Sequence, residues 1–369
     1  MSLTTEGITK AVTARVLVTG GAGFVGASVA LWLKAAHPDW QITALDNLKR
    51  RGSELALTRL AAGGVRFSHG DVRLREDLTE AGPADWLIEC SAEPSVHAGY
   101  GGGPDYVVGS NLNGAINCLE YLRRHGGALM FISSSRVYPI AHLRALPLET
   151  AGERVRLKPG AVGEGWSAVG ISEAFPLEGA RSLYGATKLA AELMIEEYAA
   201  LYGLRAVVNR CGVICGPWQM GKVDQGFVSL WLARHMFGGQ LSYIGYGGTG
   251  TQVRDILHVA DLCRLIDLQM GDPDRFAGKT YNVGGGPDTS ISLRELTRQC
   301  QALTGTSIAI DKVSATSAAD VPYYVTDSAR IRAAAGWRPE YSLAATLSDI
   351  HKWLADNRTA LAPIFTAGN

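Results

Sequence analysis

The chain has 369 residues, of which 47% are hydrophobic and 19% charged, and its 35 Lys and Arg balance 35 Asp and Glu. This length suffices for one large core or for two domains that share a cleft. Proteins that bind nucleic acid or a membrane surface through bulk electrostatics carry an excess of basic residues, so we expect neither partner here.

Six cysteines are spread between Cys90 and Cys300. Only Cys211 and Cys215 lie close together, and no second pair or histidine cluster completes a zinc site, so we expect no metal. We interpret the cysteines as reduced thiols of a cytoplasmic protein. The uncharged stretch 16–33 resembles a targeting or membrane-spanning segment. Its glycines weaken a spanning helix and no cleavage pattern follows it, so we expect neither and interpret the protein as soluble.

Strand and helix patterns alternate along the first part of the chain. Short runs of apolar and β-branched residues predict strands at 15–19, 41–45, 65–69, 86–90, 129–133 and 206–209. Helical stretches separate most of them, notably 27–36, 111–125 and 184–202. This alternation is typical of βαβ units and predicts an α/β fold with a doubly wound parallel sheet.

The pattern changes near residue 211, where Gly and Pro become frequent and loops such as 245–250 follow. We expect a dinucleotide-binding domain from 12–210 plus 253–285, in which the second segment returns to the sheet. We expect a smaller, mixed substrate-binding lobe from 211–252 plus 286–369.

A glycine-rich turn lies between the first predicted strand and the first predicted helix. Its glycines have G-x-x-G-x-x-G spacing at Gly20, Gly23 and Gly26. Glycine lets the backbone approach a pyrophosphate, and the N-terminus of the following helix supplies free N–H groups and a partial positive charge. We therefore predict a dinucleotide site here, which also includes Phe24 and Val25.

A carboxylate ends the second predicted strand. Asp46 lies 20 residues after Gly26, where it can accept the ribose hydroxyls and repel a 2′-phosphate, so we expect NAD rather than NADP. The basic residues 49–51 leave NADP as an alternative, because they also suit a 2′-phosphate. The other cofactor residues that we predict here follow the second, third and fourth strands: Asn47, Arg51, Asp71, Val72, Ser91, Ala92 and Glu93.

A phenol and an ammonium lie one turn apart on the predicted helix 184–202, at Tyr184 and Lys188. The ammonium favours the ionised phenol, which is a base able to take a hydroxyl proton while a hydride leaves the same carbon. Upstream, Ser133-Ser-Ser-Arg-Val-Tyr138 follows the fifth strand, and a serine hydroxyl there can hold the reacting oxygen.

In their order along the chain, these motifs resemble the extended short-chain dehydrogenase/reductase family of nucleotide-sugar epimerases and dehydratases. The resemblance covers roughly residues 14–340 and includes Arg254-Asp-Ile-Leu-His-Val-Ala-Asp261. It implies a Rossmann fold and bound NAD. It also implies Ser134 as the hydroxyl partner, Tyr184 as the acid/base and Lys188 as its electrostatic support.

The resemblance implies further roles that the residues alone do not. Asn111 matches an asparagine that holds its helix and a water near the lysine, and Asn111, Tyr184 and Lys188 are expected to contact the cofactor. A homodimer is expected, in which the helices 111–125 and 184–202 pack against their mates.

Within the family, the 4,6-dehydratases carry Asp-Glu directly after the catalytic Thr or Ser. Ser135 and Arg136 stand at those positions here, which disfavours a dehydratase. The stretches 46–53, 223–227 and 250–255 resemble the CDP-paratose (CDP-tyvelose) 2-epimerases, which oxidise C2 of the sugar and return the hydride to its other face. A 2-epimerase of a nucleoside-diphosphate sugar is the leading hypothesis. A 4-epimerase of the UDP-galactose type and a non-catalytic dinucleotide sensor are the alternatives.

The substrate residues are predicted with less support from motifs. Arg254 is expected to bind the diphosphate, because a guanidinium suits phosphate oxygens, and an ion pair with Asp255 is the alternative. Trp218 fits the sugar pocket and structural packing equally well. The remaining predicted substrate residues are Ser135, Arg136, Gln219 and Gln225.

Overall fold

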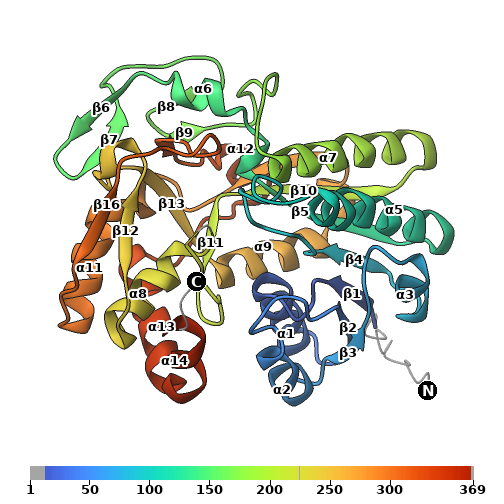
Figure 1. Ribbon diagram of the computed structural model, residues 1–369. Coiled ribbons are helices and arrows are strands. Elements are labelled where there is room, and N and C mark those ends of the chain that lie inside the picture. Colours follow the sequence, from blue (N-terminus) through green and yellow to red (C-terminus); the bar gives the residue numbers. More distant parts are fainter. Residues whose placement is uncertain (1–12, 224, 367–369) are drawn as a thin grey trace, which may run out of the picture.

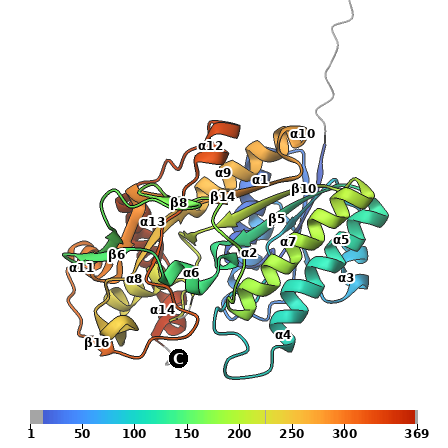
Figure 2. The ribbon, with the colours of Figure 1, turned by 90° about the horizontal axis from the view of Figure 1, so that it is seen from above.

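The computed structural model describes residues 13–223 and 225–366. Two lobes lie side by side, one built on a large parallel sheet and the other built mainly from the last third of the chain (Figures 1 and 2). No helix in the described part of the chain combines the length and the apolar character that crossing a membrane requires.

The first lobe is a doubly wound α/β domain, which confirms the predicted fold class. Within the described residues its sheet has seven parallel strands in the order β14-β10-β5-β4-β1-β2-β3. All six predicted strands are present in this sheet. The strands are β1 (Arg15–Thr19), β2 (Gln41–Asp46), β3 (Arg66–His69), β4 (Trp86–Glu89), β5 (Ala128–Ser134), β10 (Arg205–Cys211) and β14 (Lys279–Val283).

Helices cover both faces of this sheet because alternate strand residues are apolar on both sides. Val16 and Val18 contribute to the core under one set of helices, whereas Leu17 contributes to the other core. The first set is α1 (Phe24–Ala36), α2 (Leu55–Ala62), α9 (Val259–Gly271), α10 (Pro273–Phe276) and α12 (Ala329–Ala335). The second set is α3 (Arg75–Glu80), α4 (Asp105–Val108), the π-helical turn η1 (Gly109–Asn113), α5 (Gly114–His125) and α7 (Leu183–Tyr202).

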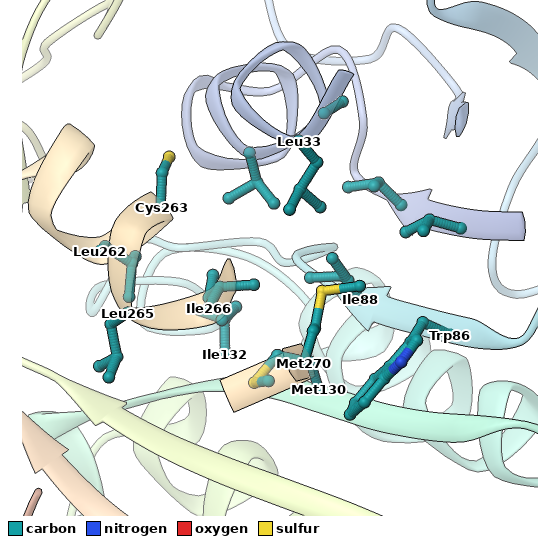
Figure 3. Packing of buried hydrophobic residues seen from close by; sticks show 14 of the residues in the cluster. Leu33, Trp86, Ile88, Met130, Ile132, Leu262, Cys263, Leu265, Ile266 and Met270 are labelled. Carbon is teal, nitrogen blue, oxygen red and sulfur yellow. The ribbon is translucent and has the colours of Figure 1, made fainter. Parts of the chain in front are cut away.

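Helix α9 is the element of segment 253–285 that seals the first core. Figure 3 shows Leu262, Leu265 and Ile266 of α9 in one buried cluster with Leu33 of α1 and Met130 of β5. These side chains are buried, so removing them from water stabilises the docking of α9 onto the sheet. The chain therefore returns to the first lobe after its excursion into the second.

The second lobe holds smaller sheets. Strand β13 (Val253–His258) pairs with β11 (Val213–Cys215), β15 (Ser290–Ser292) and β17 (Tyr323–Tyr324), and β12 (Leu241–Ile244) pairs with β16 (Ile310–Val313). Their helices are α8 (Phe227–Phe237), α11 (Leu293–Thr304), α13 (Leu343–Asp356) and α14 (Arg358–Thr366). The short helical turn η3 (Tyr246–Gly248) connects β12 to β13, and η4 (Pro287–Thr289) leads from β14 of the large sheet into β15.

The segment 138–182 leaves the first lobe and packs against the second (Figure 1). Its buried Leu143, Ile171 and Phe175 share a core with Val253 and with residues 321–325. Its elements are α6 (Ile140–Arg144), β6 (Leu148–Ala151), β7 (Arg154–Leu157), β8 (Trp166–Ser167) and β9 (Gly170–Ile171), which follow the turn η2 (Ser135–Val137). The domain division by residue ranges stays a prediction. In space, β13 lies in the smaller sheet, and 138–182 lies with the second lobe.

Candidate active site

A cavity of about 420 Å³ opens where the central strands end. Residues directly after or at the ends of β4, β5 and β10 line it, among them Cys90, Ser134 and Cys211. Second-lobe residues such as Arg254 and Asp320 line its other side. The carboxyl edge of a doubly wound sheet is the place where such folds bind ligands.

The glycine turn between β1 and α1 leaves no room for side chains. A Cβ on Gly26 would lie 2.2 Å from the carbonyl oxygen of Gly20, and one on Gly20 would lie 2.8 Å from the backbone of Cys90. Gly20 also has a φ of +62°, which favours glycine. Gly23 caps α1, while Phe24 and Val25 begin the helix and line the cavity. The turn is thus a cradle of backbone N–H groups at a helix N-terminus.

The end of β2 presents a carboxylate beside this cradle. Asp46 accepts hydrogen bonds from the backbone N–H groups of Ala22 (3.1 Å) and Leu48 (2.7 Å). Burial raises the pKa of Asp46, and these backbone hydrogen bonds oppose that rise. Asn47 donates to Asp71 (2.8 Å), so the predicted residues that follow β2 and β3 lie together.

Asp71 also forms an ion pair with Arg73 at 2.7 Å. Burial raises the pKa of Asp71, but hydrogen bonds from Arg73 and Asn47 prevail and lower it to about 2. The neighbouring Val72 is buried. By contrast, Arg51 is exposed on the turn after β2, and its neighbour Arg50 reaches the second lobe, where it donates to the Met220 carbonyl at 3.0 Å and to Gln225.

The segment after β4 is held against α7 by one asparagine. Asn111 is fully buried in η1, accepts from the N–H of Glu93 (2.8 Å) and donates to the Glu93 carbonyl (3.2 Å). Its amide also donates to Thr187 of α7 (3.2 Å). Ser91 is buried and Ala92 lines the cavity, so Asn111 fixes this stretch at the cavity edge.

Ser134, Tyr184 and Lys188 line the same cavity. Ser134 ends β5 and accepts from the N–H of Arg136 (3.1 Å), which orients its hydroxyl. Tyr184 lies in the first turn of α7, where Ser182 caps the helix by accepting from Gly185 N–H (3.2 Å). Ser134 and Tyr184 are 50 positions apart in the sequence, and in the structure both line one cavity.

Lys188 forms an ion pair that the sequence analysis missed. Its Nζ lies 3.2 Å from Oε2 of Glu89, the last residue of β4, and both side chains are buried. Burial by itself lowers the pKa of Lys188, but the Glu89 carboxylate opposes this and the net direction is upward. A single carboxylate at the end of an otherwise apolar strand, Trp-Leu-Ile-Glu, was the available signal.

A second buried ion pair lies one turn further along α7. Glu192 accepts from Arg210 of β10 (2.7 Å) and from Ser133 of β5. Arg210 also contacts the hydroxyl of Tyr138, which donates to Asn282 of β14 (2.7 Å). This network joins α7 to three strands and therefore supports the helix that carries Tyr184 and Lys188.

Two guanidinium groups face the cavity on the second-lobe side. Arg254 donates to Asp320 (3.0 Å) and to the Val321 carbonyl (2.7 Å), so its carboxylate partner is Asp320 and not Asp255. Arg136 donates to the Ala319 carbonyl (3.2 Å). Burial, and then the charge of Arg254, lower the pKa of Arg136 to about 10, so the Arg136 guanidinium stays cationic near neutral pH.

The other predicted substrate residues differ in their availability. Ser135 lines the cavity, as predicted for a substrate residue. Gln219 and Gln225 line it too, but the Gln219 amide is engaged by the Ile214 carbonyl (2.9 Å) and Ser229 (3.1 Å), and Gln225 accepts from Arg50. Trp218 is absent from the described cavity lining and packs between Arg59 and Trp353.

The residues present fit NAD. The glycine cradle has the space and the N–H groups for a pyrophosphate, and the Asp46 carboxylate suits ribose hydroxyls. Among the described residues, no group of three or more His, Cys, Asp and Glu side chains could hold a metal ion. All six cysteines are free thiols.

Comparisons with known proteins agree with this geometry. A family model described as "NAD dependent epimerase/dehydratase family" matches residues 16–284. The chain is similar to CDP-paratose 2-epimerase of Salmonella typhi, with 26% identity over 92% of this chain and 98% of that protein. It is similar to dTDP-glucose 4,6-dehydratase of Streptomyces niveus, with 30% identity over 95% of each protein.

A solved structure extends these comparisons. A double mutant of dTDP-glucose 4,6-dehydratase from Streptomyces venezuelae, solved with NAD bound, matches with a TM-score of 0.77 and 28% identity. The match covers 95% of this chain and 99% of that chain. The similarity therefore includes both lobes and not the cofactor domain alone.

Proposed function

The chain belongs to the NAD-dependent epimerase/dehydratase family, and from this premise we propose that it epimerises a nucleoside-diphosphate sugar at C2 through transient oxidation. NAD is the cofactor. The observation that carries the proposal is that Ser134, Tyr184 and Lys188 line one cavity with Arg136 and Arg254. An acid/base group and two cations for an anionic substrate thus share one space.

The side chains of the cavity have complementary tasks in this reaction. Tyr184 takes the proton of the sugar hydroxyl, and Ser134 holds the same oxygen by a hydrogen bond. Lys188 favours the ionised phenol through its charge. Bound NAD supplies the hydride acceptor and donor. On return of the hydride to the other face of the carbon, Tyr184 gives the proton back to the oxygen.

The cations bind the other end of the substrate. Arg254 is oriented by Asp320 and the Val321 carbonyl, which leaves further N–H groups for diphosphate oxygens. Arg136 reaches the same side from the turn after Ser134. Two guanidinium groups against one lining carboxylate give this side of the cavity a positive balance that favours an anion.

The shortage of free carboxylates in the cavity favours epimerisation over dehydration. Loss of water across C5 and C6 needs an acid and a base beside the sugar in addition to Tyr184. Among the described lining residues, Asp320 is the one carboxylate, and it is paired with Arg254. Ser135 and Arg136 follow Ser134 where the dehydratases carry Asp-Glu.

The alternatives are a 4-epimerase and a non-catalytic dinucleotide sensor. A 4-epimerase needs the same three residues, and only the orientation of the sugar differs. A sensor has no need of a serine, a phenol and an ammonium arranged around one cavity. The intact set therefore favours an enzyme, and the similarity of residues 46–53, 223–227 and 250–255 to the 2-epimerases favours C2.

We also propose that the protein acts as a homodimer in the cytoplasm. Leu193, Leu201 and Tyr202 of α7 are more than half exposed, at 55%, 70% and 56%. An apolar surface of this kind on α7, which packs beside α5, suits contact with a second copy. Sedimentation as a monomer would contradict the dimer.

The reaction is tested by NMR in deuterated water, with the purified protein and CDP-, UDP-, GDP- and dTDP-hexoses and no added cofactor. We expect an inverted C2 centre without solvent deuterium, because the hydride returns from the bound cofactor. Inversion at C4 would show that the enzyme is a 4-epimerase and not a 2-epimerase. Solvent deuterium in the product would contradict hydride transfer and indicate a carbanion mechanism. In a matched sample, Tyr184→Phe should lower turnover about 1000-fold and leave NAD bound.

A further inference from the structure

A buried ion pair lies one helical turn along α7 from the proposed acid/base tyrosine. Oε2 of Glu89, at the end of β4, lies 3.2 Å from Nζ of Lys188 on α7, and these side chains are 1% and 2% exposed. Glu89 belongs to none of the motifs that carry the family resemblance. The side chains assigned to the proposed reaction do not include Glu89.

An aromatic ring lies on another side of the ammonium. Nζ of Lys188 lies 4.4 Å from the centroid of the Phe131 ring, which belongs to β5. Glu89 and Phe131 are neighbours in register on adjacent strands, so the carboxylate and the ring hold the ammonium from two sides. A buried ammonium without a counter-charge tends to lose its proton.

Four other titratable groups face the pair. They are Cys90 after β4, Cys118 on α5, Cys211 on β10 and Tyr184 one turn earlier on α7. Burial raises the pKa of each thiol, that of Cys211 to about 12, so the thiols are neutral near physiological pH. Within the described part of the chain, Glu89 is the one carboxylate in ion-pair contact with Lys188.

We propose that Glu89 is a positioning residue whose carboxylate fixes the Lys188 ammonium at the end of β4 and keeps it protonated in its buried place. The inference rests on the proposed function, in which the charge of Lys188 favours the ionised Tyr184. Burial is the largest influence on Lys188 and lowers its pKa, whereas the Glu89 carboxylate and Tyr184 raise it and prevail. Without the carboxylate, burial should dominate.

The direct test is NMR titration of the NAD-loaded protein carrying ¹³Cε-labelled lysine, with the Lys188 signal assigned by Lys188→Met. In the unchanged protein, Lys188 should remain an ammonium up to alkaline pH. In Glu89→Gln it should lose its proton at a pH lower by about one unit or more. Equal titration of Lys188 in both proteins would overturn the proposal.

The chain offers a matched control in Glu192→Gln. Glu192 lies one turn from Lys188 on the same helix, is equally buried, and pairs with Arg210 at 2.7 Å. This variant loses a comparable ion pair and should lose comparable stability, but the titration of Lys188 should change little. If Glu192→Gln shifted Lys188 as much as Glu89→Gln does, general loosening of α7 would explain the effect and Glu89 would have no special part.

A second readout is the pH profile of kcat. Deprotonation of Lys188 removes the charge that assists Tyr184, so the alkaline limb of Glu89→Gln should move to lower pH together with the NMR titration. If the titration moves and the alkaline limb does not, the ion pair holds but the charge of Lys188 has no part in the reaction. That result would contradict the proposed function and leave the electrostatic assignment standing.

Glu89→Asp keeps the test decisive if Glu89→Gln does not fold. It retains the carboxylate and draws it back by one methylene, so the shift of Lys188 should have the same direction and be smaller. KM for the sugar nucleotide should stay close to its original value while kcat falls, because only the position of the ammonium changes. A titration of Lys188 unchanged in Glu89→Asp would count against the proposal.

Discussion

The proposed cofactor site and the proposed sugar side of the cavity are built in different ways. On the cofactor side, short consecutive segments after β1, β2 and β4 form the site largely with backbone atoms and with the carboxylate of Asp46. On the sugar side, Arg136, Gln225, Arg254 and Asp320 come from four distant parts of the chain. Local segments encode the first site, and the packing of two lobes encodes the second.

This difference decides how each side responds to substitution. A site built from backbone fails when a side chain enters its space, even if the new side chain is a methyl group. A site built from side chains fails when a charge or a hydrogen bond is removed, and its backbone tolerates the change. The comparison can therefore be tested by variants that affect one side and spare the other.

The largest expected effect belongs to Gly26→Ala on the cofactor side. The new Cβ would lie 2.2 Å from the Gly20 carbonyl oxygen, so the turn must open and its N–H groups must move. We expect NAD to bind about 100-fold more weakly and stability to fall by about 1–3 kcal/mol. NAD content after purification and a fluorescence titration measure the affinity.

The control for this variant is Gly271→Ala at the end of α9. A Cβ there would meet nothing within 4 Å, so the same chemical change should leave NAD binding intact. Equal loss of NAD in both variants would show that general destabilisation, and not closure of the cradle, weakens binding.

A smaller effect is expected from Arg254→Met on the sugar side. This change removes a guanidinium that Asp320 and the Val321 carbonyl orient toward the cavity. Loss of charge-assisted hydrogen bonds to a diphosphate should raise KM for the sugar nucleotide about 10- to 100-fold. Initial-rate kinetics measure KM, and the NAD content should remain that of the unchanged protein.

Arg144→Met is the matched control on this side. Arg144 holds the same loop from outside the cavity, through the carbonyls of Ser317 and Asp320 (2.8 Å each). If the two variants raised KM equally, Arg254 would act by supporting the loop and not by binding the substrate.

The same contrast explains how much of the molecule the sequence predicts. The six strands of the central sheet that lie between residues 15 and 211 were predictable because buried parallel strands are apolar and glycines and helices separate them. Strand β14 was expected only as a segment that returns to the sheet, because its Lys-Thr-Tyr-Asn-Val sequence lacks a strong apolar run. The path of 138–182 over the second lobe has no local signal, since its partners lie near residue 253 and at 321–325.

Side chains of the site show the same limit. The glycine turn and the pair Tyr184 and Lys188 are predicted from spacing because the proposed chemistry needs those residue types at those intervals, whereas Ser134 is implied by the family resemblance. Glu89 could not be recognised as the partner of Lys188, because a strand end and a helix 99 positions apart meet only in the folded chain. Gln219 matched a sugar-binding amide by type, but the fold commits its amide to Ile214 and Ser229.

The smallest expected effect concerns an arginine that joins the two sides. Arg50 follows Asp46 on the turn after β2 and donates to the Met220 carbonyl (3.0 Å) and to Gln225 in the second lobe. Nearby, a Cβ on Gly52 would lie 2.7 Å from Cγ of Met220, so the two segments are in close contact. Met220 and Gln225 therefore cover the turn that follows Asp46.

Arg50→Ala should accordingly loosen this cover without removing any group of the proposed chemistry. We expect NAD to dissociate about three- to tenfold faster and kcat to change little, because a part-buried hydrogen bond of this kind contributes about 0.7–1.4 kcal/mol. Stopped-flow displacement of NAD measures the rate. Arg51→Ala gives the comparison, since Arg51 is the exposed neighbour that the sequence pattern selects for the cofactor. If NAD left Arg51→Ala faster than Arg50→Ala, Arg51 would be the residue that retains NAD. The contact of Arg50 with the second lobe would then have no part in NAD retention.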